Sequence, residues 1–328
     1  MKTHLRDSAA LDTLRPEGSG KGYGSARISC SKNYAQTMRR RGKSRNTRLI
    51  RRIPMMSKTK AFTLIELLVV IAIIALLMSI LMPAMQRVKK QAKTVACLTQ
   101  LKQWSLYFSM YTEEYDGKFM QGYSGVAGGG NNRWVKAMGD YHKWDSDIAC
   151  CPNAKKPWQD ENGISNNLSG TYLGSTTAWG YYQPSGWAKP FKGSYGINGW
   201  CNNPDPGVTP HGLPAANFWR TPNVSGAGYI PLFLAAQRYN AWPQHTDYPP
   251  EYDGKIWNDD AQMGRYCLNR HDGFVGCLLL DYSARKVGLK ELWTLKWHRA
   301  FNTAGPWTRA GRAVSSDWPE WMRHFKEY

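Results

Sequence analysis

A single acidic residue interrupts a long apolar stretch of the sequence. Residues 62–82 contain one charged side chain, that of Glu66. An ionised carboxylate at the centre of an apolar membrane helix costs about 3 kcal/mol, so Glu66 needs either a cationic partner or access to lipid headgroups. A cationic group on a neighbouring chain would be such a partner.

His271 and Asp281 have nine residues between them and form a second pair whose side chains could do chemistry. An imidazole and a carboxylate are suited to general acid and base catalysis. The sequence contains no nucleophile elbow, no phosphate-binding loop and no zinc-protease motif. We therefore expect both residues to be structural turn residues and the chain not to be an enzyme. A membrane-tethered hydrolase that uses both side chains is the alternative.

The seven cysteines include no C-x-x-C pair, so the usual zinc pattern is absent and no metal site is predicted. If residues 265–280 form a hairpin with a three-residue loop, Cys267 lies opposite Cys277. Their Cβ atoms are then roughly 4.5–5.5 Å apart, which a disulfide can bridge with slight adjustment. If Asp272-Gly273 is instead a two-residue turn, which Asp-Gly favours, the bridge is strained. Both registers remain open, and the further cysteines that could pair are Cys150, Cys151 and Cys201.

We expect no cofactor. Residues 160–163 read Asp-Glu-Asn-Gly and offer oxygen ligands, so a calcium ion there is the alternative. The histidines in aromatic loops have no metal-ligand spacing; they are His142, His211 and His245.

The apolar stretch and the residues after it predict one long helix. About 20 apolar residues span a bilayer as a helix, and residues 62–82 meet this length. From Val88 to Tyr111 apolar residues recur every three or four positions, which predicts an amphipathic helix, and Asp116-Gly117 predicts its end. We expect a helix of roughly 80 Å with a kink near Pro83, its first half in a membrane and its second half on a soluble domain. A cleaved secretory signal is the alternative, but no A-x-A site follows the stretch.

Basic residues are concentrated before the apolar stretch. The net charge is +19, and residues 1–61 carry 16 Lys and Arg against three Asp and Glu, whereas residues 62–328 carry 27 against 21. We predict a disordered or cleaved leader over residues 1–61, with Met55 and Met56 as alternative translation starts. No nucleic-acid partner is expected, because the basic residues do not belong to a binding face. The lysines of the leader predict a cytoplasmic N-terminus.

Residues 62–115 are thus assigned to the long helix, and residues 116–328 are predicted to form a head, so the fold class is α+β. The negative mean hydropathy excludes a multi-span membrane protein. The 15 Trp and 18 Tyr either pack in the core, which we favour, or provide sugar-binding surfaces. The elements expected in the head are short strands near residues 193–200, 229–235 and 285–287, and a helix over residues 289–299.

An N-terminal segment resembles the signature of type IV pilins and type II secretion pseudopilins. It reads Lys60-Ala61-Phe62-Thr63-Leu64-Ile65-Glu66 and is followed by an apolar helix. The resemblance implies that a prepilin peptidase cuts before Phe62 and methylates the new amino group. Pro83 matches a proline that is frequent in the family, whereas Ala61 stands where glycine is usual.

A second resemblance lies in the rest of the chain. His271 and Asp281 are similar to the H-X9-DG region of large pilin-like proteins of planctomycete-type bacteria, with Tyr282 in place of the glycine. Cys151-Pro152 and residues 194–198, which read Ser-Tyr-Gly-Ile-Asn, also resemble pieces of that group.

The resemblances imply a structural subunit of a type II secretion pseudopilus or type IV pilus-like filament. The implied partners are other pilin-like subunits, a prepilin peptidase/N-methyltransferase, an inner-membrane assembly platform and membrane lipid. The implied location is the bacterial inner membrane, with one span, an N-terminus that is cytoplasmic before processing and a periplasmic or otherwise extracytoplasmic head. The alternative is a membrane-tethered carbohydrate-binding protein that uses a pilin-type export signal.

Overall fold

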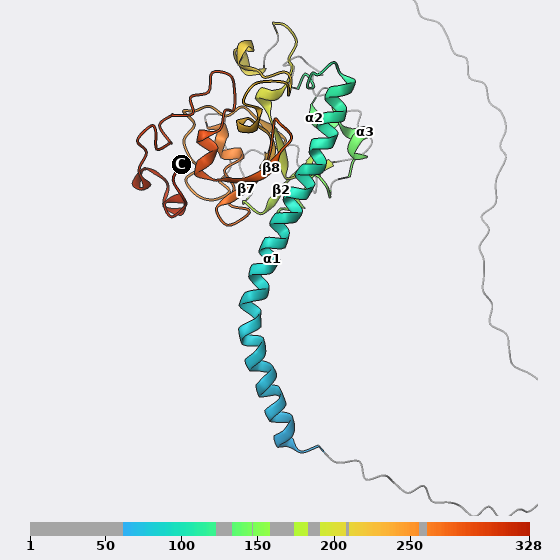
Figure 1. Cartoon of the computed structure of the whole chain (residues 1–328), viewed down its shortest axis with the longest axis vertical. Helices are drawn as coiled ribbons and strands as arrows, with labels where there is room; N and C mark the ends of the chain where they lie inside the picture. The colour runs from blue at the N-terminus through green and yellow to red at the C-terminus, as the bar shows by residue number, and fades with distance from the viewer. Residues whose placement is uncertain are drawn as a thin grey trace, which may run out of the picture. The chain divides into compact units, whose positions relative to one another are not determined.

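The computed structural model describes seven ranges of the chain: 62–122, 133–145, 147–157, 174–182, 191–207, 210–255 and 261–328. The predicted leader, with Lys60 and Ala61, lies outside the described residues, and so do the alternative calcium ligands 160–163. The described elements are a long helix, short helices and short strands (Figure 1).

Helix α1 spans Leu64–Glu114, which confirms the predicted long helix. It ends where Asp116 and Gly117 adopt φ angles of 51° and 72°, because this left-handed conformation stops a helix. Pro83 lies inside α1, and the helix continues on both sides of it.

The two halves of α1 have different surroundings. The N-terminal half extends away from the head, whereas the C-terminal half lies against it (Figure 1). The C-terminal half packs on strands β7 and β8. By length and composition α1 could cross a membrane, and it is the one such helix among the described residues. The buried residues of α1 all belong to its second half; they are Cys97, Leu101, Trp104, Ser105, Phe108, Tyr111 and Thr112.

The head is built on a five-stranded sheet with strand order β6-β4-β5-β7-β8. Strands β4, β5, β7 and β8 pair antiparallel in that order, and β6 pairs with β4 in parallel. In a smaller sheet, β2 pairs with β1 in parallel and with β3 antiparallel. The strands are β1 (Lys156–Pro157), β2 (Thr177–Tyr182), β3 (Phe191–Gly193), β4 (Tyr195–Asn198), β5 (Pro231–Ala235), β6 (Asn240–Ala241), β7 (Phe274–Leu279) and β8 (Ala284–Gly288). The predicted α+β fold class is confirmed.

Two α-helices of one turn each follow α1, and short 3-10 helices lie between the strands and after β8. The α-helices are α2 (Trp134–Ala137) and α3 (Gly139–His142). The 3-10 helices are η2 (Gly199–Cys201), η3 (Pro210–Gly212), η4 (Ala215–Asn217), η5 (Ala227–Tyr229), η6 (Gln262–Arg265), η7 (Lys290–Thr294), η8 (Ser315–Asp317) and η9 (Glu320–Met322). The helix predicted over residues 289–299 is therefore only the short 3-10 helix η7.

Close contact between α1 and the sheet depends on a glycine in β7. A Cβ atom at Gly276 would lie 2.8 Å from Cys97 Sγ and 2.9 Å from Leu101 Cδ1, so the missing side chain lets the helix approach the strand. Farther along α1, the centroid of the Trp104 ring lies 4.9 Å from the ring centroid of Phe233 on β5. No tryptophan in the described ranges is exposed, which agrees with the core packing favoured for these residues.

The strands expected near residues 193–200, 229–235 and 285–287 correspond to β3 with β4, to β5 and to β8.

The prediction of a hairpin over residues 265–280 is wrong. The Asp272-Gly273 turn is present, with φ angles of 52° and 89°, and it has the two-residue form that Asp-Gly favours. Strand β7, however, already pairs with β5 on one edge and β8 on the other. No edge of β7 therefore remains for residues 265–269.

The geometry expected for a Cys267–Cys277 bridge is consequently absent. Both residues are buried free thiols. Cys277 pairs in register with Leu234 on β5 and Arg285 on β8, and Cys267 Sγ lies 3.9 Å from Met322 Sδ.

Candidate functional site

The start of α1 presents Glu66 beside the predicted cleavage position. The backbone N–H and the hydroxyl of Thr63 both donate to Glu66 Oε2, each at 2.9 Å, and Glu66 N–H donates to Thr63 Oγ1 at 3.2 Å. This reciprocal capping box satisfies the first turn of the helix. Within the described part of the chain these contacts of the carboxylate use Oε2, so Oε1 is available for a cation. The side chain of Phe62, just before the cap, is 66% exposed.

An uncovered apolar surface follows Glu66 along α1. From Leu64 to Met85 the large apolar side chains are between 46% and 80% exposed. At Pro83 the missing N–H leaves the carbonyl of Ser79 without its helical donor. Apart from this carbonyl, the segment presents an apolar surface that the described residues of this chain do not cover.

Basic side chains mark the end of the apolar surface. Arg87, Lys89 and Lys90 follow it and are exposed. Lys90 Nζ lies 3.2 Å from Asp272 Oδ1, which brings this part of α1 next to the turn before β7. Lys102 Nζ, farther along the helix, donates to the carbonyl of Tyr282 at 2.8 Å.

His271 and Asp281 do not form a pair. They lie at opposite ends of β7, whose six residues extend roughly 20 Å. Asp281 Oδ1 accepts hydrogen bonds from the N–H and the hydroxyl of Ser283, at 2.9 and 2.6 Å, as a turn residue does. The turn role expected for Asp281 therefore fits the structure, whereas His271 is 7% exposed and faces other partners.

Tyr282 occupies the position that is glycine in the H-X9-DG region. Its φ is 64°, a left-handed conformation that glycine adopts without steric cost. The Tyr282 hydroxyl lies 3.0 Å from Thr112 Oγ1 on α1. The tyrosine thus adopts the conformation typical of the missing glycine and adds a contact to the helix.

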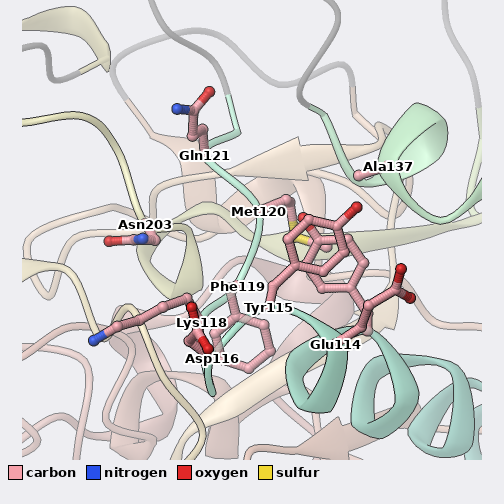
Figure 2. Close-up of a pocket in the computed structure, with 10 residues that line it drawn as sticks. Glu114, Tyr115, Asp116, Lys118, Phe119, Met120, Gln121, Ala137 and Asn203 are labelled. Carbon is pink, nitrogen blue, oxygen red and sulfur yellow. The ribbon is translucent and has the colours of Figure 1, made fainter.

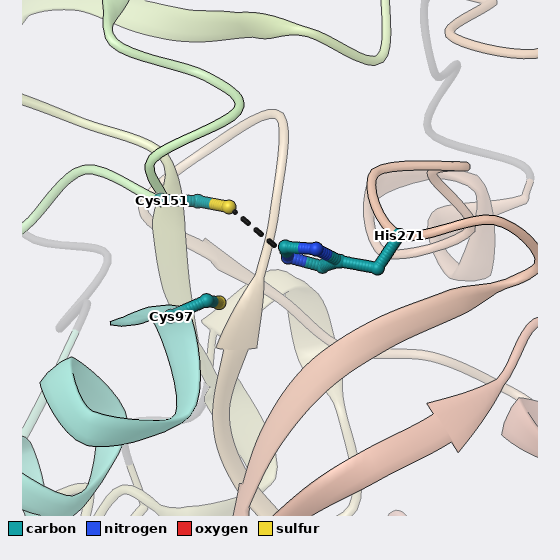
Figure 3. A group of neighbouring side chains, drawn as sticks. All are labelled: Cys97, Cys151 and His271. Carbon is teal, nitrogen blue, oxygen red and sulfur yellow. Dashed lines mark hydrogen bonds between the residues drawn. The ribbon is translucent and has the colours of Figure 1, made fainter. Parts of the chain in front are cut away.

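His271 lies beside two cysteines that were not predicted to be near it. Cys97 comes from α1, Cys151 from the loop before β1, and His271 from the turn before β7 (Figure 3). Cys151 Sγ and His271 Nε2 are 3.3 Å apart. A hydrogen bond from the Cys97 thiol and the positive charge of Arg270 lower the pKa of Cys151, whereas burial raises it. The sequence could not reveal this cluster from spacing, because its three residues lie far apart along the chain.

A cavity of about 360 Å³ opens at the C-terminal end of α1 (Figure 2). The rings of Tyr111 and Tyr115 stack there with centroids 4.3 Å apart, and Tyr115 is 49% exposed. The hydroxyl of Tyr141 donates to the Glu114 carboxylate nearby, and burial raises the pKa of Tyr111 to about 12. The other lining residues are Asp116, Lys118, Phe119, Met120, Gln121, Ala137 and Asn203.

Comparison with known proteins identifies the N-terminal segment. Residues 56–82 match the family described as the prokaryotic N-terminal methylation motif, which includes Phe62 and Glu66. No curated protein and no solved structure matches the chain. The motif and the long apolar helix fit a single-pass protein of the inner membrane. The chain thus carries a prepilin-type methylation motif, which supports a type IV pilin-like protein that is processed by prepilin peptidase and assembles with other pilin subunits.

Proposed function

We propose that the chain is a structural subunit of a type II secretion pseudopilus or a type IV pilus-like filament, and that it is not an enzyme. The observation that carries this proposal is the continuity of α1. One helix joins an uncovered apolar half that bears the methylation motif to a half that packs in the core of the head. Such a helix can place its first half in a bilayer or among the helices of neighbouring subunits while the head stays outside.

The motif supports a proposal for processing and orientation as well. The prepilin peptidase/N-methyltransferase cuts before Phe62 from the cytoplasmic side and leaves a methylated, cationic amine at the start of α1. The head, from about residue 86 onward, is then periplasmic or otherwise extracytoplasmic. An inner-membrane assembly platform extracts the subunit from the lipid and adds it to the filament.

Glu66 is proposed to select the position of each new subunit. Its Oε2 is held by the capping box, and its Oε1 faces no described partner. A neighbour's methylated amine supplies the opposite charge. In an apolar surrounding an unpaired carboxylate is costly, so subunits that place the amine at Glu66 are favoured.

Three variants separate the charge of Glu66 from its capping role. Glu66→Gln keeps an acceptor for the capping box but removes the charge, Glu66→Leu removes both, and Thr63→Val weakens the cap alone. We expect membrane insertion of all three. Cross-linked ladders of membrane-extracted subunits should disappear for Glu66→Gln and Glu66→Leu and persist for Thr63→Val. Ladders of wild-type length in Glu66→Gln would contradict the charge pairing.

The position of His271 and Asp281 at opposite ends of β7 argues against a tethered hydrolase that uses both side chains. Carbohydrate binding remains a second candidate through the cavity of Figure 2, where the half-exposed Tyr115 stacks on Tyr111 beside polar side chains. Sugars bind on such aromatic faces. Retention of the full chain on polysaccharide affinity gels should be lost in Tyr115→Ala if this function exists. Absence of retention for the wild type would remove the candidate.

A further inference from the structure

Three metal-ligating side chains converge in the core of the head. The Sγ atoms of Cys97 and Cys151 and a ring nitrogen of His271 all lie within 4.8 Å of one another (Figure 3). Both cysteines are fully buried, and His271 is nearly so. Figure 3 shows the imidazole and the two sulfur atoms pointing into the same space from three separate segments.

The hydrogen bonds of His271 orient its Nε2 lone pair toward the sulfur atoms. The Thr94 hydroxyl donates to the carbonyl of Lys90 at 3.1 Å, so its single proton is used. Thr94 Oγ1 lies 3.0 Å from His271 Nδ1 and can therefore accept a hydrogen bond from an Nδ1–H group. Asn153 Nδ2 is farther from Nδ1, at 3.4 Å, and donates to the carbonyl of Arg270 at 2.5 Å. This arrangement resembles that of metal-binding histidines, whose other ring nitrogen is held by an outer hydrogen bond.

The two cysteines are held in place by strand β4 and the residue before it. Cys151 N–H donates to Ser194 Oγ at 2.6 Å, and the Tyr195 hydroxyl lies 3.1 Å from Cys97 Sγ. The three sequence pieces that resemble planctomycete-type proteins therefore meet at one point: Cys151-Pro152, residues 194–198 and His271.

A buried cation completes the cluster. Arg270 is 3% exposed and donates to the backbone carbonyls of Ser175, Ser194, Thr177 and Ala236. Among the described residues it forms no ion pair with a carboxylate. A buried charge is stable when an opposite charge lies nearby, and thiolates at Cys97 and Cys151 would provide it.

We propose that Cys97, Cys151 and His271 bind a thiophilic d¹⁰ metal ion, Cu⁺ or Zn²⁺. Thiolate and imidazole ligands select these ions. Metal–sulfur and metal–nitrogen bonds of about 2.3 and 2.0–2.1 Å place the sulfur and nitrogen ligands roughly 3.5 Å apart in a tetrahedral site and roughly 3.8 Å apart in a trigonal one. Cys151 Sγ and His271 Nε2 are 3.3 Å apart without metal, so a small outward shift of these two atoms suffices for either geometry. On binding, each cysteine that still carries its S–H proton releases it to solvent, and two metal–sulfur bonds form.

The ligand count and charge favour Cu⁺. Three ligands suffice for a trigonal Cu⁺ site, whereas Zn²⁺ needs a fourth ligand, such as water. Two thiolates and Cu⁺ carry one negative charge, which Arg270 balances. A cavity of about 360 Å³ lined by Thr94, Asn153 and His271 extends from the surface to the imidazole of the cluster. The bound ion would connect α1 to the head.

The test uses the full chain in detergent, reduced and stripped of metal, and then supplied with Zn²⁺ or with chelator-buffered Cu⁺. We expect about one ion per chain, with at least tenfold loss of affinity in Cys97→Ser, Cys151→Ser and His271→Gln. The matched controls Cys201→Ser and Cys277→Ser, which remove equally buried thiols outside the cluster, should bind like the wild type. Comparison of the two ions decides between Cu⁺ and Zn²⁺.

Alkylation of the wild type keeps the test valid if a variant fails to fold. The bound ion should protect Cys97 and Cys151 from alkylation during partial unfolding and leave the reactivity of Cys201 unchanged. Absence of stoichiometric binding by both ions would overturn the proposal. Recovery of a Cys97–Cys151 disulfide, without metal, from protein isolated under non-reducing conditions would also overturn it.

Discussion

The two halves of helix α1 have the same backbone conformation but opposite environments. In the first half, Leu64 is 80% exposed and even Val70 is 46% exposed, whereas in the second half Leu101 and Trp104 are fully buried. The second half finds its cover within the same chain, on β5, β7 and β8. The first half has no cover among the described residues, and its exposed apolar surface fits burial in lipid or against other subunits.

This difference separates two kinds of apolar residue. Those of the second half pack in the core of the head, whereas those of the first half serve insertion and assembly under the proposed function. Substitutions in the second half should therefore lower the stability of the head, whereas substitutions in the first half should impair membrane insertion or assembly.

The largest effect on folding is expected at Trp104. Its ring packs on Phe233, and its Nε1 donates to the carbonyl of Ile148 at 2.9 Å. Trp104→Ala should lower the free energy of unfolding of the head by about 3–5 kcal/mol. The matched change Leu76→Ala in the exposed half should alter it by less than about 0.5 kcal/mol. Denaturant unfolding in detergent measures the free energy of unfolding of both variants. Equal losses of this free energy would contradict the different roles of the two halves of α1.

A smaller effect is expected where α1 approaches β7. Gly276→Ala places a Cβ atom against Cys97 and Leu101 and should destabilise the head by about 1–3 kcal/mol. Gly264→Ala is the control, since its new Cβ would come no closer than 4.0 Å to another atom. If Gly276→Ala unfolds at the same denaturant concentration as the control, the close packing of helix and strand is wrong.

Acid should destabilise the head through His142. Burial lowers the pKa of His142 to about 4, and the unfolded chain takes up this proton near pH 6.5. Stability is therefore lost as the pH falls from about 6.5 toward 4, by at most about 3 kcal/mol. Burial raises the pKa of Asp247 to about 6, which acts in the opposite direction, but this contribution cancels when two variants are compared.

The variant His142→Phe isolates the histidine term. The ring of His142 lies among Trp104, Trp144 and Phe191, so phenylalanine suits the site. Unfolding measured between pH 7 and 4 should show a smaller loss for the variant than for the wild type. Parallel pH profiles would show that His142 does not titrate on unfolding.

The smallest effect is expected at the junction of the two halves. Lys90 pairs with Asp272, but both side chains are well exposed, and such pairs contribute about 0–1 kcal/mol. Lys90→Ala should change the unfolding free energy by less than about 1 kcal/mol, with less effect at high salt. A larger loss in the same denaturant titration would show that the junction itself stabilises the head.

Local patterns in the sequence predict α1, its end at Asp116-Gly117 and most strands, because these depend on residues close together in the chain. The hairpin over residues 265–280 fails for a tertiary reason. The Asp272-Gly273 turn forms as predicted, but β5 and β8 pair with the two edges of β7. The cluster of Cys97, Cys151 and His271 could not be predicted from spacing, since only the folded chain brings α1, a loop and the β7 turn together.

The most direct test of the different roles of the two halves of α1 is the N-terminus of the protein recovered from membranes, determined by intact mass and N-terminal sequencing. The account predicts a chain that starts at Phe62, carries one N-methyl group and retains the whole apolar half of α1. An N-terminus after Pro83 would contradict it, because a cleaved secretory signal would leave only the half of α1 that belongs to the head.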